Sequence, residues 1–351
     1  MTFISTLRGH SRVVGAGVAV AAAAIALAGC SSGGTTPSDS GKPAANYNIV
    51  VMPKSLGNKY FQASDAGAQA AIQAFGGTYS EQAANEASPT AQSPFIQSAI
   101  QSGAGAIVLA ANDPQAVCSD LQSAQQAGIK VVTFDSDTNC RDLFINQVTV
   151  QAVADGLVKL ITDHLGAAGG NVGIESGGPN ATNLNAWVDA IKADLAQHPE
   201  IKLISDIAYG NDADQDSYNA AKGLITAHPE INAIIAPDSV AVKEAAHYIQ
   251  DANLTGKIWL TGLGLPSELK DYVHAGVIEK FGLWNVGDLG SLAAQAAKAL
   301  IDGTITGKTG DTFQATLSDG TPQTFTVGDK GEVDLGPLFV FDASNVDQFN
   351  F

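Results

Sequence analysis

Short apolar runs alternate with alanine-rich stretches of helical length from residue 48 onward, and this alternation constrains the fold more than any other feature. Strands are expected at 48–53, 106–110 and 130–134, and the helices between them close at glycines. After residue 150 the rhythm restarts, with strands expected at 171–176, 202–207, 232–237, 257–262 and 279–284. Apolar strands separated by helices are typical of parallel sheets covered on both faces. We therefore predict an α/β fold of two doubly wound parallel-sheet units.

The N-terminus has the pattern of an export signal. A short basic start precedes an apolar stretch at 13–27 that is too short for a comfortable membrane span. The sequence LAGC at 27–30 resembles a bacterial lipobox, so we expect a signal peptide at 1–29 and a lipid on Cys30. An ordinary signal peptide with an incidental cysteine is the alternative. Residues 30–46 are rich in Ser, Gly and Pro and suit a flexible tether, which places the protein outside the cytoplasm as a membrane-anchored lipoprotein.

Charge and length limit the classes of function. The net charge of −17 becomes −19 once Arg8 and Arg12 leave with the signal peptide. Such a charge disfavours binding of nucleic acid, and membrane contact is expected only through the lipid. The mature chain is too long for one typical core, so two domains are expected. Cys118 and Cys140 remain as an even pair in an exported chain, which favours a disulfide over two free buried thiols.

Polar and aromatic residues follow the expected strands, where ligands of open parallel sheets bind. Two such sheets facing each other would enclose a cleft. The candidate ligand contacts are Lys54, Asn58, Tyr60, Asp113, Asp135, Asp137, Asn183, Asn185, Trp187, Pro237, Asp238, Ser239, Trp284 and Asn285. Carboxylates and amides bond to hydroxyl groups, and aromatic rings cover C–H faces, so the set points to a sugar.

The strand-end aspartates differ in their alternatives. Asp113 stands before a proline and an expected helix, so helix capping explains it better than ligand contact. Asp135 is not followed at once by a helix, and ligand contact at the cleft rim is favoured there. For Asp137, shaping the loop and contacting the ligand remain equally open.

Other chemistries fit the sequence poorly. Asp135, Asp137 and Asn139 begin like a calcium loop, but Cys140 and Asn146 stand where that loop needs Gly and Glu. The histidines lack zinc-ligand spacing, and neither a complete G-x-G-x-x-G nor a G-x-S-x-G motif occurs. Residues two apart on an extended segment point in opposite directions, so the two aspartates make a poor catalytic pair. We therefore expect no metal, no cofactor and no enzymatic activity.

Five segments stand out at the expected strand ends: MPKSLGNKYF (52–61), FDSDTNCRDLFINQ (134–147), ATNLNAW (181–187), IIAPDSVAV (234–242) and KFGLWNV (280–286). Together with the lipobox and the tandem units, they resemble type I sugar-binding proteins of ABC importers. The branch most similar holds autoinducer-2-binding and rhamnose-binding receptors, and the resemblance covers roughly 47–351. The resemblance implies two lobes on a three-segment hinge, which close on a small neutral carbohydrate or polyol and deliver it to a membrane permease. We expect a monomer.

The same resemblance implies lobe boundaries and ligand positions. The first lobe would hold 47–148 plus 287–320, and the second 149–286 plus 321–351. Lys54, Asp135 and the turn at 237–239 match family ligand positions, and the family's cysteine pair matches Cys118 and Cys140. Autoinducer-2 receptors have Asp-Gln where this chain has Asn183 and Leu184, which favours a neutral sugar or sugar alcohol. A receptor for an autoinducer-2-like signal and an exported carbohydrate-active enzyme remain as alternatives.

Overall fold

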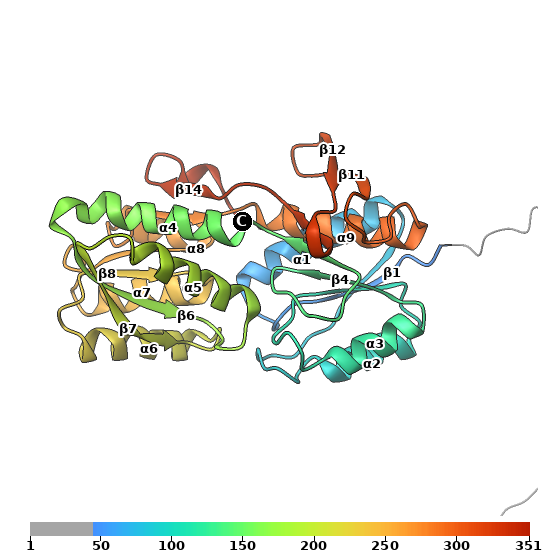
Figure 1. Ribbon diagram of the computed structural model, residues 1–351, viewed down its shortest axis with the longest axis horizontal. Coiled ribbons are helices and arrows are strands. Elements are labelled where there is room, and N and C mark those ends of the chain that lie inside the picture. The colour runs from blue at the N-terminus through green and yellow to red at the C-terminus, as the bar shows by residue number, and fades with distance from the viewer. Residues whose placement is uncertain (1–44) are drawn as a thin grey trace, which may run out of the picture. The chain divides into compact units, whose positions relative to one another are not determined.

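Strands and helices alternate in the computed structural model as the sequence predicts (Figure 1). The structure describes residues 45–351. The predicted signal peptide, the predicted lipidation site at Cys30 and the predicted tether up to residue 44 lie outside the described residues. Among the helices of 45–351, none has the length and apolar character needed to cross a membrane.

Six parallel strands form the first sheet, in the order β2-β1-β3-β4-β5-β13. They are β1 (Asn48–Met52), β2 (Thr78–Glu81), β3 (Ala106–Leu109), β4 (Lys130–Phe134), β5 (Leu143–Asn146) and β13 (Glu332–Asp334). The helices are α1 (Lys59–Ala74), α2 (Ser93–Gln101), α3 (Cys118–Gln126) and α9 (Val286–Asp302). We call this part the first lobe, together with the antiparallel hairpin of β11 (Thr312–Thr316) and β12 (Pro322–Thr326).

The second sheet repeats this strand order. Its parallel core is β7 (Ile201–Tyr209), β6 (Gly170–Ser176), β8 (Ala233–Ala236) and β9 (Trp259–Gly262). β10 (Lys280–Leu283) lies beside β9 and is joined to it by two isolated parallel bridges, Leu260 to Ile278 and Leu263 to Gly282. β14 (Phe339–Asp342) pairs antiparallel with β10. The helices are α4 (Val150–Leu165), α5 (Thr182–Leu195), α6 (Asp214–Ala227), α7 (Ser239–Asp251) and α8 (Pro266–His274). We call this part the second lobe.

The first sheet is buried on both faces, as its near-continuous apolar strands require. Ile49 and Val51 belong to the core that includes residues of α1 and α9, whereas Val50 and Met52 belong to a separate core with residues of α2 and α3. Figure 1 shows these helix pairs on opposite sides of the sheet. Each such side chain contributes about 1.5–3 kcal/mol through burial.

Helices α1 and α9 lie in unusually close contact, although more than 200 residues separate them. A Cβ added to Gly67 would lie 1.9 Å from the Gly287 carbonyl oxygen, and one at Gly290 would lie 1.8 Å from that of Ser64. Only glycine permits this approach of two backbones. The contact holds α9 against the first lobe after the chain has passed through β6 to β10 of the second lobe.

The chain passes between the lobes three times within 45–351, around 147–149, 284–285 and 335–338 (Figure 1). The predicted fold of two doubly wound lobes is confirmed. The predicted lobe boundaries remain a prediction, with two differences in detail. The segment 321–351 was expected in the second lobe, but β12 pairs with β11 in the hairpin of the first lobe and β13 pairs with β5 of the first sheet, whereas β14 joins the second.

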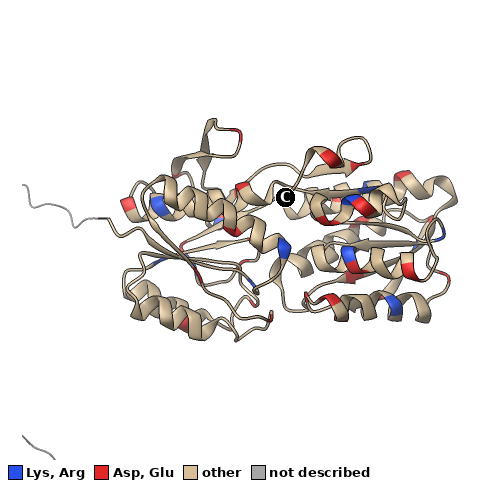
Figure 2. Ribbon diagram, turned by 180° about the vertical axis from the view of Figure 1, so that it is seen from behind, with Lys and Arg blue, Asp and Glu red and all other residues tan. Residues whose placement is uncertain are grey.

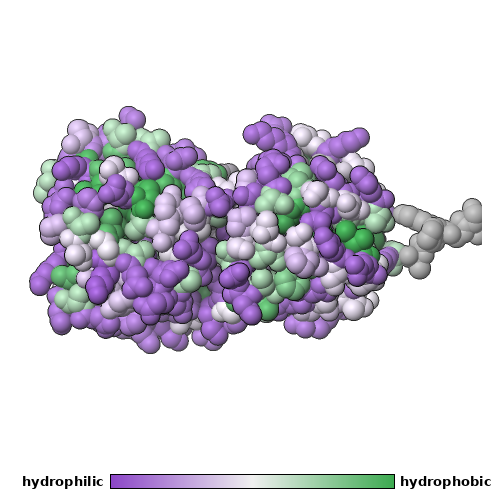
Figure 3. Space-filling model, turned by 90° about the horizontal axis from the view of Figure 1, so that it is seen from below, coloured by the Kyte–Doolittle hydropathy of each residue, from purple (hydrophilic) through white to green (hydrophobic). Residues whose placement is uncertain are grey.

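Two further features concern covalent bonding and the surface. Cys118, at the start of α3, is bonded to Cys140 in the loop after β4, so the predicted disulfide is confirmed. Acidic residues are spread over both lobes, as the net charge requires (Figure 2). On the face seen in Figure 3, polar residues predominate and apolar residues are scattered among them.

Candidate functional site

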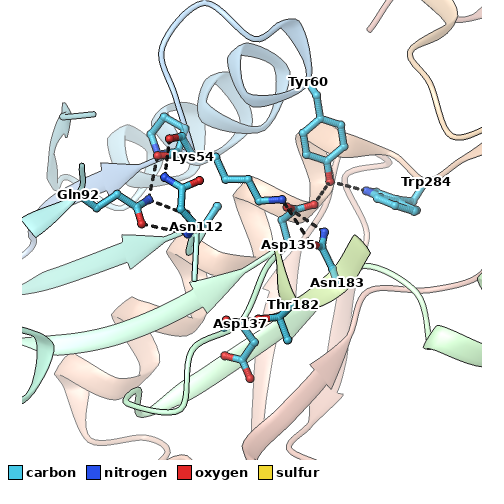
Figure 4. A network of polar contacts seen from close by, with 11 residues as sticks. Lys54, Tyr60, Gln92, Asn112, Asp135, Asp137, Thr182, Asn183 and Trp284 are labelled. Atoms are coloured by element: carbon cyan, nitrogen blue, oxygen red, sulfur yellow. Dashed lines mark hydrogen bonds and ion pairs between the residues drawn. The ribbon is translucent and has the colours of Figure 1, made fainter. Parts of the chain in front are cut away.

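A network of polar side chains joins the two lobes at the carboxyl ends of the strands (Figure 4). Lys54, after β1, lies with its Nζ 3.4 Å from Oδ2 of Asp135, after β4. Asn183 of α5 bridges from the second lobe, because its Oδ1 accepts from Lys54 Nζ at 3.3 Å and its Nδ2 donates to Asp135 Oδ2 at 3.2 Å. Three of the predicted ligand contacts, which are far apart in the sequence, therefore contact one another in the structure.

Asp135 is the centre of this network. Its Oδ1 accepts from the Tyr60 hydroxyl at 2.8 Å, and that hydroxyl accepts from Trp284 Nε1 at 3.0 Å. The backbone of Asp135 has a φ of 60°, in the left-handed region that Asp and Asn tolerate best among residues with a side chain. The carboxylate was expected on an open rim, but Asp135 is only 4% exposed. It is a buried anchor in contact with both lobes.

A second set of hydrogen bonds fixes Lys54 from behind. Gln92 donates from Nε2 to the carbonyls of Pro53 and Ala110, at 3.2 and 2.7 Å. Asn112 donates from Nδ2 to the Lys54 carbonyl at 3.0 Å. These bonds tie the end of β1 to the end of β3, so the lysine projects from a braced backbone (Figure 4).

Aromatic rings form one side of the site. The rings of Trp187 and Trp284 have centroids 5.8 Å apart, and Tyr60 meets Trp284 edge to face at 6.2 Å. Such rings give flat apolar surfaces beside polar groups, which suits the C–H faces of a sugar. Trp187 comes from α5 of the second lobe, and Trp284 directly follows β10 at the start of a crossing segment.

The cavity between the lobes has an empty volume of about 350 Å³ with its open mouth included. The centre of a water molecule reaches only about 30 Å³ of it, so side chains nearly fill the cleft. A carbohydrate would therefore require the lobes to separate. The lining residues are Lys54, Asn58, Tyr60, Phe61, Asp135, Asn183, Leu184, Trp187, Asp212, Pro237, Asp238, Ser239, Leu263, Leu283 and Trp284.

Ten of the fourteen predicted contacts line this cavity, and four do not. Asp113 caps its own turn, with Oδ1 accepting from the amides of Gln115 and Ala116 at 2.8 Å. Asp137 is held by Arg141, at 2.9 Å between Oδ2 and Nη2. The remaining two bond elsewhere: Asn185 donates to the Pro179 carbonyl, and Asn285 accepts from the amide of Asp288 at the start of α9. The capping alternative for Asp113 and the loop-shaping alternative for Asp137 fit these contacts.

Asp137 nevertheless takes part in the contact between lobes. Its backbone carbonyl accepts from the Thr182 hydroxyl at 3.0 Å (Figure 4). The aspartate side chain therefore holds the loop, while its backbone touches the second lobe.

The charges in the cavity are unequal. Lys54 is the one cation among its lining residues within 45–351, against three carboxyl groups from Asp135, Asp212 and Asp238. Burial alone would lower the pKa of Lys54, but the three carboxylates outweigh it and raise that pKa. Burial raises the pKa of Asp135, and Lys54 opposes the rise. Burial and then the neighbouring Asp212 raise the pKa of Asp238 well above its ordinary value.

The sequence prediction missed Asp212 for a definable reason. The strand was expected to end at residue 207, but β7 continues to Tyr209, which moves the strand-end loop to 210–213. Asn211 and Asp212 both have a φ of 54°, which is typical of a tight turn. The sequence Gly-Asn-Asp at 210–212 is a turn signal that could have indicated it. Apolar lining residues such as Leu184 and Leu263 carry no such signal, because they resemble ordinary core positions.

The comparisons with known proteins agree with this geometry. The family model described as periplasmic binding protein domain matches residues 49–305. A solute-binding protein of a Clostridium phytofermentans ABC transporter, solved with bound L-rhamnose, is similar at 35% identity, covering 87% of this chain and 98% of its own, with a TM-score of 0.81. A sugar ABC transporter protein from Actinomyces odontolyticus is similar at 38% identity, with coverages of 86% and 97% and a TM-score of 0.68.

A more distant structure shares the fold. LsrB from Clostridium saccharobutylicum, in complex with AI-2, has 24% identity to this chain, coverages of 86% and 99% and a TM-score of 0.81. Since the family model spans most of the described residues and two sugar-transport proteins exceed 30% identity, this chain belongs to the periplasmic binding protein family of extracytoplasmic, type I solute-binding proteins of sugar ABC transporters.

Proposed function

We propose that this protein captures a neutral sugar or sugar alcohol in the cleft between its lobes and delivers it to the permease of an ABC importer. We further propose that lipid on Cys30 anchors it to the membrane, that the lobes follow the boundaries predicted above except at β12 and β13, and that it acts as a monomer without altering its ligand. The observation that carries the proposal is the network of Lys54, Asp135 and Asn183 beside two tryptophans.

Each part of this network suits a polyhydroxylated ligand. Carboxylate and amide oxygens accept from hydroxyl groups, and Lys54 and the amide nitrogen of Asn183 donate to them. We propose the ten predicted residues that line the cavity as ligand contacts. In the structure Lys54 and Asp135 bond to Asn183 across the cleft, and a ligand would replace these bonds with its own as the lobes close.

The alternatives have less support. Leu184 lies in the cavity lining at the position where autoinducer-2 receptors have a polar amide, so a signal molecule of that kind would lose a hydrogen bond here. An enzyme would need a nucleophile or an acid paired with a base. The carboxylate of Asp135 is instead occupied by three donors.

A thermal-shift panel tests the proposal. Pentoses, deoxyhexoses including L-rhamnose, tetritols and pentitols would be added to the purified protein, and the melting temperature measured. A ligand at 100 times its Kd stabilises by about 2.7 kcal/mol, a shift that such an assay resolves. We expect at least one carbohydrate to stabilise the protein and to be recovered unchanged by mass spectrometry. Chemical alteration of the carbohydrate, or no response to any member of the panel, would contradict the proposed function.

A further inference from the structure

The hairpin of β11 and β12 is attached to the crossing segment that carries Trp284. Strand β10 ends at Leu283 and α9 begins at Val286. Only Trp284 and Asn285 therefore lie between the lobes at this crossing. Trp284 lines the cavity, whereas residues 312–326 of the hairpin contribute nothing to the cavity lining. The proposed function therefore gives the hairpin no role, although the hairpin bonds to the residue that follows Trp284.

Ser318, at the tip of the hairpin, makes this attachment. Its backbone amide donates to Asp288 Oδ1 at 2.7 Å, and its hydroxyl donates to Asp288 Oδ2 at 3.0 Å. The same hydroxyl accepts from Asn285 Nδ2 at 3.0 Å. A serine hydroxyl has one hydrogen to donate and lone pairs to accept, so both capacities are used here. Ser318 therefore joins the crossing segment to the first turn of α9.

Helix capping does not explain the whole of this arrangement. Asn285 is the N-cap of α9, since its Oδ1 accepts from the Asp288 amide at 3.2 Å. A cap of this kind uses only the side-chain oxygen. The amide nitrogen of Asn285 is free to bond elsewhere, and it donates to the hairpin. Asn285 is therefore held both by the helix that it begins and by the hairpin that follows this helix in the chain.

The hairpin is itself fixed to the first lobe, beside α9 (Figure 1). Gln295, two turns along α9 from Asp288, donates from Nε2 to the Thr316 carbonyl at 2.9 Å. The Thr316 amide donates to Gln295 Oε1, also at 2.9 Å, so the side chain pairs with the hairpin backbone as a neighbouring strand would. Phe313 and Phe325 are buried, with ring centroids 5.9 Å apart. A group bonded to the hairpin tip is therefore bonded to the first lobe.

This attachment leads directly to the carbohydrate site. Trp284 donates from Nε1 to the Tyr60 hydroxyl at 3.0 Å, and that hydroxyl donates to Asp135. Leu317, the residue before Ser318, lines a second pocket together with Trp284, so the hairpin tip lies near this ring. Trp284 is thus held to the first lobe at two points, through its own ring and through the neighbouring Asn285.

We propose that Ser318 is a positioning residue for the carbohydrate site, which holds Trp284 in the first lobe by anchoring Asn285. The inference rests on the proposed function and adds a role for the hairpin. Rotation of the lobes at this crossing is then confined to the backbone before Asn285, and the ring of Trp284 is in place before the second lobe closes. A ring that is already ordered lowers the entropy cost of binding.

Isothermal titration calorimetry tests the proposal with the carbohydrate that gives the largest thermal shift in the panel. Ser318→Ala removes the hydroxyl and both of its hydrogen bonds, whereas Ser318→Thr keeps a hydroxyl. Ser318 is exposed and lies outside the cavity lining, so both variants should fold. We expect Kd to rise about threefold in Ser318→Ala, because exposed hydrogen bonds contribute at the low end of their usual range. Ser318→Thr should restore the Kd of the wild type.

Thr324→Val is the matched control, since the Thr324 hydroxyl also lies on the hairpin surface but accepts from Gln314 within the hairpin, at 2.6 Å. This variant loses a hairpin hydrogen bond without touching the crossing segment, and it should keep the Kd of the wild type. An unchanged Kd in Ser318→Ala, or equal effects of Ser318→Ala and Thr324→Val, would overturn the inference while leaving the proposed function intact.

If no carbohydrate on the panel binds, the proposed function fails, and a measurement on the free protein decides the inference alone. NMR follows hydrogen exchange of the indole N–H groups, and Trp284→Phe identifies the signal of Trp284. We expect this N–H to exchange about threefold faster in Ser318→Ala than in the wild type, and Ser318→Thr to restore its protection. The indole of Trp259, in β9 of the second lobe, should be unchanged. Equal exchange of the Trp284 indole in the wild type and Ser318→Ala would overturn the inference.

Discussion

Each sheet ends in loops that line the cleft, but the loops of the two lobes carry different charged side chains. The first lobe provides Lys54 and Asp135 as a bonded pair of opposite charges, on a backbone braced by Gln92 and Asn112. The second lobe provides Asp212 and Asp238, and the one cation among the cavity-lining residues of 45–351, Lys54, belongs to the other lobe. The same strand order thus supports a bonded ion pair on one side and two acids on the other.

This difference indicates a division of roles. The first lobe holds its polar groups in a fixed arrangement before a ligand arrives, which reduces the entropy cost of binding. The second lobe contributes Asn183, which bonds to both members of the ion pair, and the carboxyl groups of Asp212 and Asp238. Four predictions test the comparison, from the largest expected effect to the smallest.

Loss of the anchor in the first lobe should have the largest effect. Asp135→Asn keeps the left-handed backbone but leaves Lys54 buried without a carboxylate, so the protein should lose about 3 kcal/mol of stability. Carbohydrate affinity should fall by about 100-fold or more, because charged hydrogen bonds contribute about 1.5–3 kcal/mol each. Denaturant unfolding and calorimetry measure the two effects. Asp137→Asn, two residues away and outside the cavity lining, should change affinity little; equal losses in both variants would refute the anchor.

The disulfide should stabilise the first lobe only, because both of its cysteines belong to that lobe and the chain has no cysteine between residues 141 and 351. Replacing Cys118 and Cys140 by serine should lower stability by about 3 kcal/mol, as expected for a sequence separation of 22 residues in the chain-entropy model. Urea unfolding of the double variant measures this loss. The wild type in reducing agent should reproduce it, and an unchanged midpoint in either sample would show that the bond does not hold the Asp135 loop.

A buried acid away from the cleft should affect stability but not binding. Burial and the nearby Glu81 raise the pKa of Asp65, on α1, to about 8. Because the folded pKa lies above the unfolded value, the protein should lose stability as pH rises from about 4 to 8, by about 1.4 kcal/mol per unit. Asp65→Asn should flatten this slope in thermal unfolding between pH 6 and 7. A variant that instead altered carbohydrate affinity would place Asp65 in the cleft mechanism.

The aromatic side of the cleft should give the smallest effect. Trp284→Phe keeps a ring but removes the Nε1 hydrogen bond to Tyr60, which orients the hydroxyl that donates to Asp135. Loss of one such bond is worth about 1 kcal/mol, so affinity should fall about fivefold. Trp259→Phe is the control, because its buried Nε1 has no partner and its ring stacks on His164. Equal effects of the two variants on Kd would argue against an orienting role.

The sequence predicted the lobes and most of the cavity because apolar periodicity fixes strands, and parallel strands end at one edge. It placed Lys54, Asp135 and Asn183 correctly among the cavity residues. It missed β5, β11 and β13, which are only three to five residues long. It missed Asp212 because β7 runs two residues further than the pattern indicated. Whether Asp113 or Asn285 caps a helix or turns into the cleft depends on side-chain direction, which sequence spacing does not specify.

A crystal structure of the protein purified with its native ligand tests the central claim most directly. The account predicts an unmodified carbohydrate in the cavity, with hydroxyl groups within hydrogen-bond distance of Asp135 from the first lobe and of Asp212 or Asp238 from the second. A ligand without hydroxyl groups, a ligand bound outside this cavity, or contacts from only one of the two lobes would contradict it.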